Sequence, residues 1–234
     1  MNQKVSFYLR CRWSGSRLAL LLALLLLLAP GPAPAAGGPA ELEGVARQLQ
    51  ETYNRTGSFR AQFRQLTTLP MGGRQREGAG TVIFRKPHQM RWEYDLPDHQ
   101  VLVSDGRQVR LYFAASRQMM LRDVADYLES DVTYAFFSGT GDLLRDFSVE
   151  EIPAAEVRPG RGHLLRLVPR ELHPQVEYLD LEADRDSFLI RRLEIVDHFG
   201  SVTTLNFSRI ELDPELPPDF YRFTPPDGTE ILGQ

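Results

Sequence analysis

The clearest pattern in the chain is an alternation of apolar and polar residues between residues 79 and 113. Turn sequences divide this segment into four short runs, at Lys86-Pro87, Leu96-Pro97-Asp98 and Ser104-Asp105-Gly106. In the second run, Met90, Trp92 and Tyr94 are separated by single charged residues. A period of two is typical of antiparallel strands that pack one face and expose the other. The packed face is aromatic and carries no obvious catalytic group, which favours a protein that binds apolar material.

Strand patterns also cover most of the remaining chain, and helical periodicity replaces them in two places. Residues 39–54 predict a helix, because apolar residues recur on one face between Leu42 and Tyr53. Residues 123–145 break the strand pattern and predict one or two short helices. Further strands are predicted at residues 59–64, 119–122, 147–152, 163–168, 176–181, 188–196, 202–212 and 220–223. We therefore expect about 11 strands in one uninterrupted meander, with no linker or repeat that divides them.

The number of consecutive strands restricts the fold class. So many strands in one domain favour a strongly curved sheet or a partly closed barrel. The apolar faces of the helices need a partner, and the aromatic face of the sheet is the largest one available. The pattern therefore predicts a mainly β protein whose helices cover the concave side of the sheet.

The first 35 residues predict a cleaved secretory signal peptide. Basic residues at Lys4, Arg10, Arg12 and Arg17 precede an apolar run, and Ala33-Pro34-Ala35 offers small residues for cleavage. The alternative is a membrane anchor, but the run from Leu18 to Ala29 is shorter than the roughly 20 residues of a spanning helix. Cys11 precedes the apolar run instead of following it, so a lipidated mature chain is not expected. Residues 36–234 are then a single domain.

Composition excludes several classes of partner and chemistry for residues 36–234. This segment holds 23 basic and 31 acidic residues, a formal net charge of −8, which suits neither nucleic acid nor anionic membranes. It contains no cysteine, so the fold is built without disulfides, and Lys86 is its single lysine. The five histidines are scattered without the spacing of metal ligands. The acidic run from Asp180 to Asp186 lacks the glycine that a calcium loop needs, so it is expected in a solvated turn. No enzyme motif, cofactor or metal site is predicted.

Four segments in this order and spacing resemble the LolA family of periplasmic lipoprotein carriers. The first two are residues 58–65 (SFRAQFRQ) and residues 78–112, which contain the sequences KP, W, P and VSDG in that order. The other two are residues 196–200 (VDHFG) and residues 220–228, which contain YRFTPPDG. The resemblance implies an unclosed antiparallel β-barrel with a helical lid over a hydrophobic cavity. It also implies a non-enzymatic, monomeric periplasmic chaperone. Such a carrier accepts acylated outer-membrane lipoproteins from an inner-membrane ABC-type exporter and passes them to an outer-membrane receptor.

The resemblance also assigns roles to individual residues. Its lipid-binding cavity would be lined by Phe59, Phe63, Val82, Phe84, Met90, Trp92 and Tyr94. Its lid would comprise residues 132–138, with lid contacts at Lys86, Val132, Phe136 and Phe137. Two positions depart from the family pattern: Lys86 replaces an arginine that helps to hold the lid, and Thr133 replaces a proline near the start of the lid helix. Lysine offers a point charge instead of a planar fork of donors.

Other interpretations of the same residues remain open at this stage. Alternating apolar residues such as Phe84, Met90 and Trp92 are most often ordinary core, and a lysine before a proline is most often a solvated turn residue. A lipid- or lipoprotein-sensing regulatory module is the main functional alternative, although such proteins usually carry a second domain. An outer-membrane receptor of this fold would need a lipidated cysteine, which residues 36–234 lack. An envelope hydrolase has no motif to support it.

Overall fold

The computed structural model describes residues 38–130, 137, 141–156 and 160–233 of the 234-residue chain. These described residues belong to one compact unit. The predicted signal segment, residues 1–35, and all of the predicted lid segment except Phe137 lie outside the described residues. Within the described ranges, no helix has the length and apolar character that crossing a bilayer requires.

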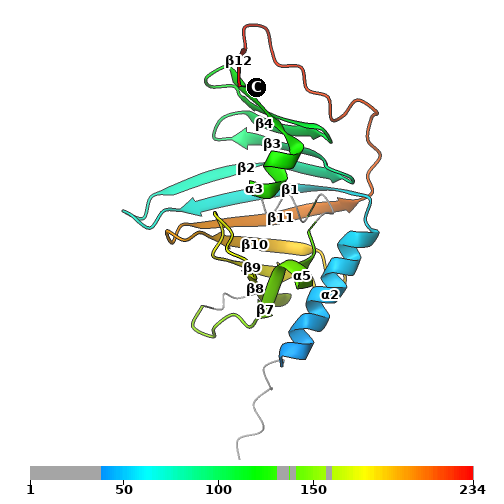
Figure 1. Ribbon diagram of the computed structural model, residues 1–234, viewed down its shortest axis with the longest axis vertical. Coiled ribbons are helices and arrows are strands. Elements are labelled where there is room, and N and C mark those ends of the chain that lie inside the picture. Colours follow the sequence, from blue (N-terminus) through cyan, green and yellow to red (C-terminus); the bar gives the residue numbers. More distant parts are fainter. Residues whose placement is uncertain (1–37, 131–136, 138–140, 157–159, 234) are drawn as a thin grey trace, which may run out of the picture. The chain divides into compact units, whose positions relative to one another are not determined.

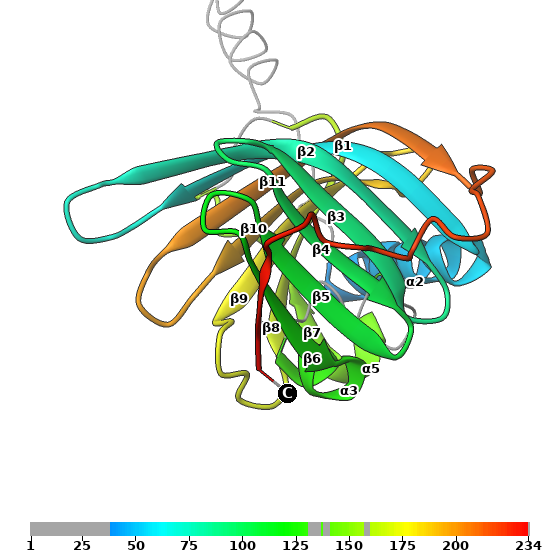
Figure 2. The same ribbon diagram turned by 90° about the horizontal axis from the view of Figure 1, so that it is seen from above.

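The described residues form a single large sheet, which curves strongly around one face (Figures 1 and 2). Its 12 strands are β1 (Ser58–Thr68), β2 (Gln75–Arg85), β3 (Gln89–Leu96), β4 (Gln100–Asp105), β5 (Gln108–Phe113), β6 (Gln118–Asp123), β7 (Phe147–Glu150), β8 (His163–Pro169), β9 (Tyr178–Ala183), β10 (Ile190–Val196), β11 (Val202–Leu212) and β12 (Glu230–Leu232). In space they follow the order β12-β6-β5-β4-β3-β2-β1-β11-β10-β9-β8-β7. The edge strands β12 and β7 do not pair with each other, so the predicted mainly β, unclosed fold is confirmed.

The predicted uninterrupted meander is wrong, because β1 lies in the interior of the sheet and not at an edge. Strands β2 to β6 follow one another on one side of β1, and β11 back to β7 follow on the other side. Strand β11 returns to pair with β1 from Phe59↔Leu212 to Thr68↔Val202. An apolar–polar alternation specifies that a strand has one packed face, but it does not specify which strand lies beside it.

The segment between β11 and β12 crosses the convex face of the sheet (Figure 2). We call residues 213–229 the strap; residues 220–223 within it, predicted as a strand, form none. Prolines in the strap lack the N–H groups that a strand ladder needs. After Asp213, whose N–H donates to Ser58 O at 2.7 Å, the backbone bonds of the strap are local, such as Arg222 N–H to Asp219 O at 2.9 Å. Its Tyr221 belongs to a convex-face cluster with Ile83, Val101, Val103, Tyr112 and Met119, and Phe220 and Phe223 pack against this cluster. Figure 2 shows the strap, in red, lying across the strands of this half.

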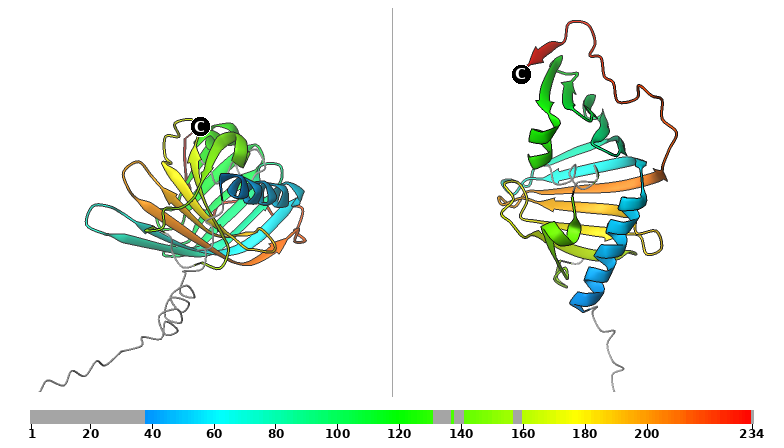
Figure 3. Two further views of the ribbon diagram at one scale, coloured as in Figure 1. Left: turned by 90° about the horizontal axis from the view of Figure 1, so that it is seen from below. Right: turned by 45° about the vertical axis from the view of Figure 1, so that its right-hand side comes forward.

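Three described helices accompany the sheet: α2 (Pro39–Arg55), α3 (Val124–Ser130) and α5 (Leu143–Asp146). The predicted helix at residues 39–54 is confirmed as α2, whose Ala46, Leu49 and Tyr53 are buried in the concave core. Helix α5 packs beside α2 (Figure 3), and the N–H of Leu143 donates to Gln50 Oε1 at 2.8 Å. The apolar face of α2 therefore packs toward the sheet, as the pattern required.

Candidate functional site

Strands β1, β2 and β3 carry the candidate site on the concave face, which we call the trough. The register sets Phe59 opposite Phe84, and Phe84 opposite Met90. Two residues further along the same strands, Val82 lies opposite Trp92. Because residues two apart along a strand share a face, the structure brings all seven sequence-predicted cavity residues together on this side: Phe59, Phe63, Val82, Phe84, Met90, Trp92 and Tyr94.

The aromatic rings of the trough contact one another directly. Phe59 and Phe84 stack with centroids 5.2 Å apart. Phe63 meets Trp92 at 5.0 Å and Tyr94 at 4.9 Å, both edge to face. Such pairs contribute about 0.5–1.5 kcal/mol each beyond their area burial. The trough wall is therefore a coherent aromatic surface and not a set of isolated side chains.

Phe137 fills the centre of the trough. It comes from the segment between α3 and α5, and only 4% of its surface is exposed. Its ring centroid lies 5.0 Å from Phe59, 5.1 Å from Phe84 and 5.4 Å from Tyr53. The trough is thus closed by a side chain of the segment that the resemblance assigns to the lid.

Lys86 fastens the end of helix α2 to the sheet. Its Nζ donates to Tyr53 O at 2.5 Å and is 3.5 Å from Asn54 O. These carbonyls belong to the last turn of α2, where backbone acceptors lack helical partners and carry partial negative charge. Desolvation lowers the pKa of Lys86, and the charge of Asp213 offsets this in part. Among the described residues, the hydrogen-bond acceptors of the Lys86 ammonium group therefore lie on α2. The other two predicted lid-contact residues, Val132 and Phe136, lie outside the described residues.

Two residues of the trough were not predicted as site residues from the sequence. Tyr53 projects from α2 into the aromatic cluster, and its hydroxyl accepts a hydrogen bond from Ile190 N–H at 3.1 Å. Burial of that hydroxyl raises the pKa of Tyr53. Phe207 on β11 lies opposite Phe63 and its ring is 6.2 Å from that of Phe137. The alternation of Leu205 and Phe207 was a usable signal, but only the β1–β11 pairing brings it to this site.

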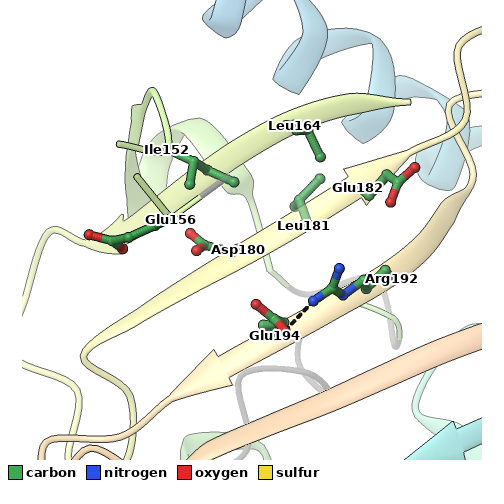
Figure 4. A pocket seen from close by; sticks show the side chains of 8 residues that line it. All are labelled: Ile152, Glu156, Leu164, Asp180, Leu181, Glu182, Arg192 and Glu194. Atoms are coloured by element: carbon green, nitrogen blue, oxygen red, sulfur yellow. Dashed lines mark hydrogen bonds and ion pairs between the residues drawn. The ribbon is translucent and has the colours of Figure 1, made fainter. Parts of the chain in front are cut away.

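A small pocket on the opposite face of β8–β10 has a different chemistry (Figure 4). It encloses about 20 Å³ and is lined largely by charged side chains, including Asp180, Glu182, Arg192 and Glu194. Asp180 makes two 2.7 Å bonds with Arg166, and Glu182 accepts N–H bonds from Arg161 and Gly162. The expected solvated turn is therefore wrong for these two residues, which lie within β9. Satisfied charges and so little space do not suit an acyl chain.

No group of three or more potential metal ligands occurs in the described part of the chain. The Asp184 carboxylate instead accepts bonds from the Ser187 N–H and hydroxyl, at 3.0 and 2.8 Å, which lowers its pKa to about 2. This carboxylate stabilises the turn between β9 and β10.

An unclosed sheet that is lined with aromatic rings and covered by a fastened helix defines a protein built around an apolar trough. The comparisons with known proteins then identify the family. Residues 54–224 match the family described as "Outer membrane lipoprotein carrier protein LolA", and the chain belongs to this LolA family.

Individual relatives agree with this assignment. The outer-membrane lipoprotein carrier protein of Nitrosomonas europaea is 30% identical over 188 residues, covering 80% of this chain and 88% of the relative. The protein of the same name from Bordetella pertussis is 31% identical over 197 residues, covering 84% and 90%. A crystal structure of an uncharacterized conserved protein from Thermus thermophilus has a TM-score of 0.51 and 14% identity, covering 82% of this chain and 98% of that one. That structural likeness concerns the fold alone.

Proposed function

We propose that this protein is a non-enzymatic periplasmic carrier that holds the acyl chains of outer-membrane lipoproteins in its trough. It accepts them from an inner-membrane exporter and delivers them to an outer-membrane receptor, as a monomer. The observation that carries the proposal is the closed aromatic trough, in which Phe137 occupies the space that acyl chains would take. Membership of the LolA family supports the choice of lipoproteins as cargo.

The closed trough also explains how strong binding and release are compatible. Burying about 40 methylenes at about 0.8 kcal/mol each would give on the order of 30 kcal/mol. Noncovalent binding reaches a practical limit of about 18–21 kcal/mol, so part of that free energy must be offset. Displacing Phe137 exposes apolar surface that the closed state buries, which supplies such an offset. The cargo then moves to a receptor with only a modest difference in affinity, because its chains never enter water.

The experiment mixes the purified protein, residues 36–234, with a lipoprotein in its acylated form and in a form whose acylated cysteine is replaced by serine. Size-exclusion chromatography should show a soluble complex with the acylated form alone. Equal binding of both forms would contradict the proposal, because the trough offers its binding free energy to hydrocarbon chains and not to the polypeptide.

Two charge substitutions test the trough itself. Trp92→Glu places a carboxylate on the concave face and should abolish the complex, because an unpaired charge cannot be buried with acyl chains. Thr81→Glu makes a matched control on the neighbouring strand, since Thr81 lies on the other face from Val82. Circular dichroism of both variants checks that they fold. Retention of cargo by folded Trp92→Glu would place the chains elsewhere.

A further inference from the structure

Within the described part of the chain, the indole N–H of Trp92 is buried on the trough face without a hydrogen-bond acceptor. No described residue places an acceptor oxygen or nitrogen within reach of its Nε1. Tryptophan is a donor only, and a buried N–H that has lost its water partners and gained none costs free energy. Phenylalanine would supply a similar ring without that cost. The unpaired donor therefore needs an explanation.

The surroundings of Trp92 explain why no described partner is at hand. Its ring meets Phe63 at 5.0 Å and Phe84 at 6.2 Å, and it stacks on Tyr94 at 6.5 Å. The cross-strand neighbours of Trp92 are Val82 and Leu102, which carry no acceptor on their side chains. In contrast, the hydroxyl of the adjacent Tyr94 donates to Gln65 Oε1 at 2.8 Å. Among the described residues, the trough thus satisfies the polar group of Tyr94 and leaves that of Trp92 unpaired.

The ligand chemistry of the proposed function supplies the missing acceptor. An acyl chain is attached through a carbonyl group, as an ester or an amide, and this carbonyl has lone pairs but no hydrogen to donate. A carbonyl drawn into an apolar trough loses its water and needs a donor. A neutral N–H matches a neutral carbonyl, whereas an ionised carboxylate would call for a cation. Lys86, the single lysine of residues 36–234, already donates to the last turn of α2.

We propose that the Trp92 indole N–H binds the carbonyl oxygen of a cargo acyl group and so makes the trough selective for acyl over alkyl chains. This inference rests on the proposed carrier function, and it adds a polar anchor to a site otherwise described by hydrocarbon contact. The hydrogen bond fixes the depth at which a chain enters, because the carbonyl must stop beside β3. Chain length beyond that point then decides how far the hydrocarbon extends through the trough.

The chain provides a direct spectroscopic reporter for this contact. Its two tryptophans are Trp13 and Trp92, and Trp13 lies in the predicted signal segment. Residues 36–234 therefore contain Trp92 as their single tryptophan, and their NMR spectrum has one indole ¹H–¹⁵N resonance. Hydrogen bonding to a carbonyl should move this resonance downfield. Contact with hydrocarbon alone should not.

The experiment compares two synthetic peptides that differ only at the carbonyl groups. One carries a diacylglyceryl group on the sulfur of its amino-terminal cysteine, and the other carries the dialkyl ether analogue, in which each ester carbonyl is a methylene. The unaltered protein should bind the diacyl peptide about tenfold more tightly, the effect of one hydrogen bond to an otherwise unpaired buried carbonyl. The indole resonance should move downfield with the diacyl peptide only.

Two variants assign the selectivity to the N–H group. Trp92→Phe should reduce the ratio of diacyl to dialkyl affinity to about one, whatever the change in both affinities from lost ring area. Phe63→Leu, on the same wall, should change both affinities alike and preserve the ratio. If Trp92→Phe does not fold, the ratio and the indole shift of the unaltered protein decide the matter.

Each outcome has a defined meaning. Equal affinities of the unaltered protein for the two peptides, an unmoved indole resonance, or a ratio that survives Trp92→Phe would overturn the role of the N–H and leave the carrier function standing. Binding of neither peptide would overturn the carrier function together with the inference.

Discussion

Lys86 shows how one side chain connects the sheet to the cover of the trough. Its ammonium group lies against the carbonyls of Tyr53 and Asn54, where the dipole of α2 is negative. Its own backbone N–H donates to Gly57 O at 2.9 Å, so the loop that follows α2 is held at the same point. An arginine, which the family pattern has here, could direct several donors at these carbonyls. The lysine holds the helix through a single point charge.

Replacing Lys86 should loosen the end of α2 more than it destabilises the whole protein. Lys86→Ala removes a charge-assisted bond from a partly exposed site, so we expect a loss of about 1 kcal/mol in the free energy of unfolding. Amide hydrogen exchange in the last turn of α2 should accelerate, and exchange in β1 should change less. Lys86→Arg is the control and should retain protection. Unchanged exchange in Lys86→Ala would mean that packing of Leu49 and Tyr53 holds the helix unaided.

The pairing of β2 with β3 shows how an element accommodates large rings. Phe63 on β1 and Tyr94 on β3 lie two strands apart, about 10 Å, yet their ring centroids are 4.9 Å apart. They meet over Gly80 of β2, which pairs with both and has no side chain. A Cβ at Gly80 would lie 1.9 Å from Glu93 O, so the backbones approach too closely for any other residue.

Gly80→Ala should therefore destabilise the protein. We expect a loss of about 3 kcal/mol, because relief of the clash must move the backbone of β3 and separate Phe63 from Tyr94. Gly44→Ala provides the matched control, since Gly44 lies within α2 with no described atom near its missing Cβ. That substitution should stabilise by about 0.5–1 kcal/mol through helix propensity. Urea denaturation measures both, and a mild effect at Gly80 would contradict the close approach.

Tyr221 holds the strap on the sheet by packing of its ring and, among the described residues, not by a hydrogen bond of its hydroxyl. Tyr221 is buried against Ile83 and its neighbours, and no described residue pairs with its hydroxyl. Burial raises the pKa of Tyr221 to about 12, although Arg85 and Arg60 lower it in part. The unfolded chain ionises near 10.0 and the folded chain near 12, so this group's contribution is complete below pH 10.0 and is lost as pH rises through 12.

Tyr221→Phe should remove that alkaline loss. The Arg85 guanidinium, 5.2 Å from the ring centroid, keeps its aromatic partner, so stability at neutral pH should be unchanged or slightly higher. The stability advantage of the variant should grow between about pH 10 and about pH 12. Thermal denaturation at several pH values measures it. An advantage that stays constant with pH would show that the folded protein ionises Tyr221 as freely as the unfolded chain does.

At the scale of the elements, the sequence predicted where the strands lie better than which strands pair with each other. Period-two alternation located β3 correctly and helical periodicity located α2, because side-chain direction is a local property. The β1–β11 pairing is not local, and neither Phe207 nor the strap could be placed without it. Val101 and Val103 alternate as regularly as Trp92 and Tyr94, yet they lie under the strap on the convex face. Alternation therefore separated two faces without stating which one is the trough; family resemblance supplied that choice.

At the scale of the whole molecule, the trough is a core that closes on itself. Phe137, Tyr53 and the rings of β1–β3 bury one another, so little of the surface proposed to bind acyl chains is exposed. Part of the free energy that stabilises the closed fold is thus opposed to ligand entry. We therefore expect substitutions that weaken this closure of the trough to lower the free energy of unfolding and to raise the affinity for an acylated ligand.

Phe137→Ala tests that opposition. Removing a buried ring should lower the free energy of unfolding by about 3–5 kcal/mol. The same substitution should raise the affinity for an acylated peptide, because the chains no longer displace the ring. Leu167→Ala, at a buried position on β8, is the control and should lower stability without raising affinity. Calorimetric titration with the peptide measures this, and a fall in affinity at Phe137 would indicate that the ring contacts cargo instead of replacing it.

Strand β12 covers an edge of the sheet that would otherwise be open to other molecules. It pairs in parallel with residues 118–120 of β6, and Gln118 Nε2 donates to Glu230 Oε2 at 3.0 Å. Without β12, that stretch would present unsatisfied backbone groups to solvent, a template on which a second molecule could add. The new edge is three residues long and the opposite edge, β7, is four. The unclosed sheet is thereby protected from polymerising through its two edge strands.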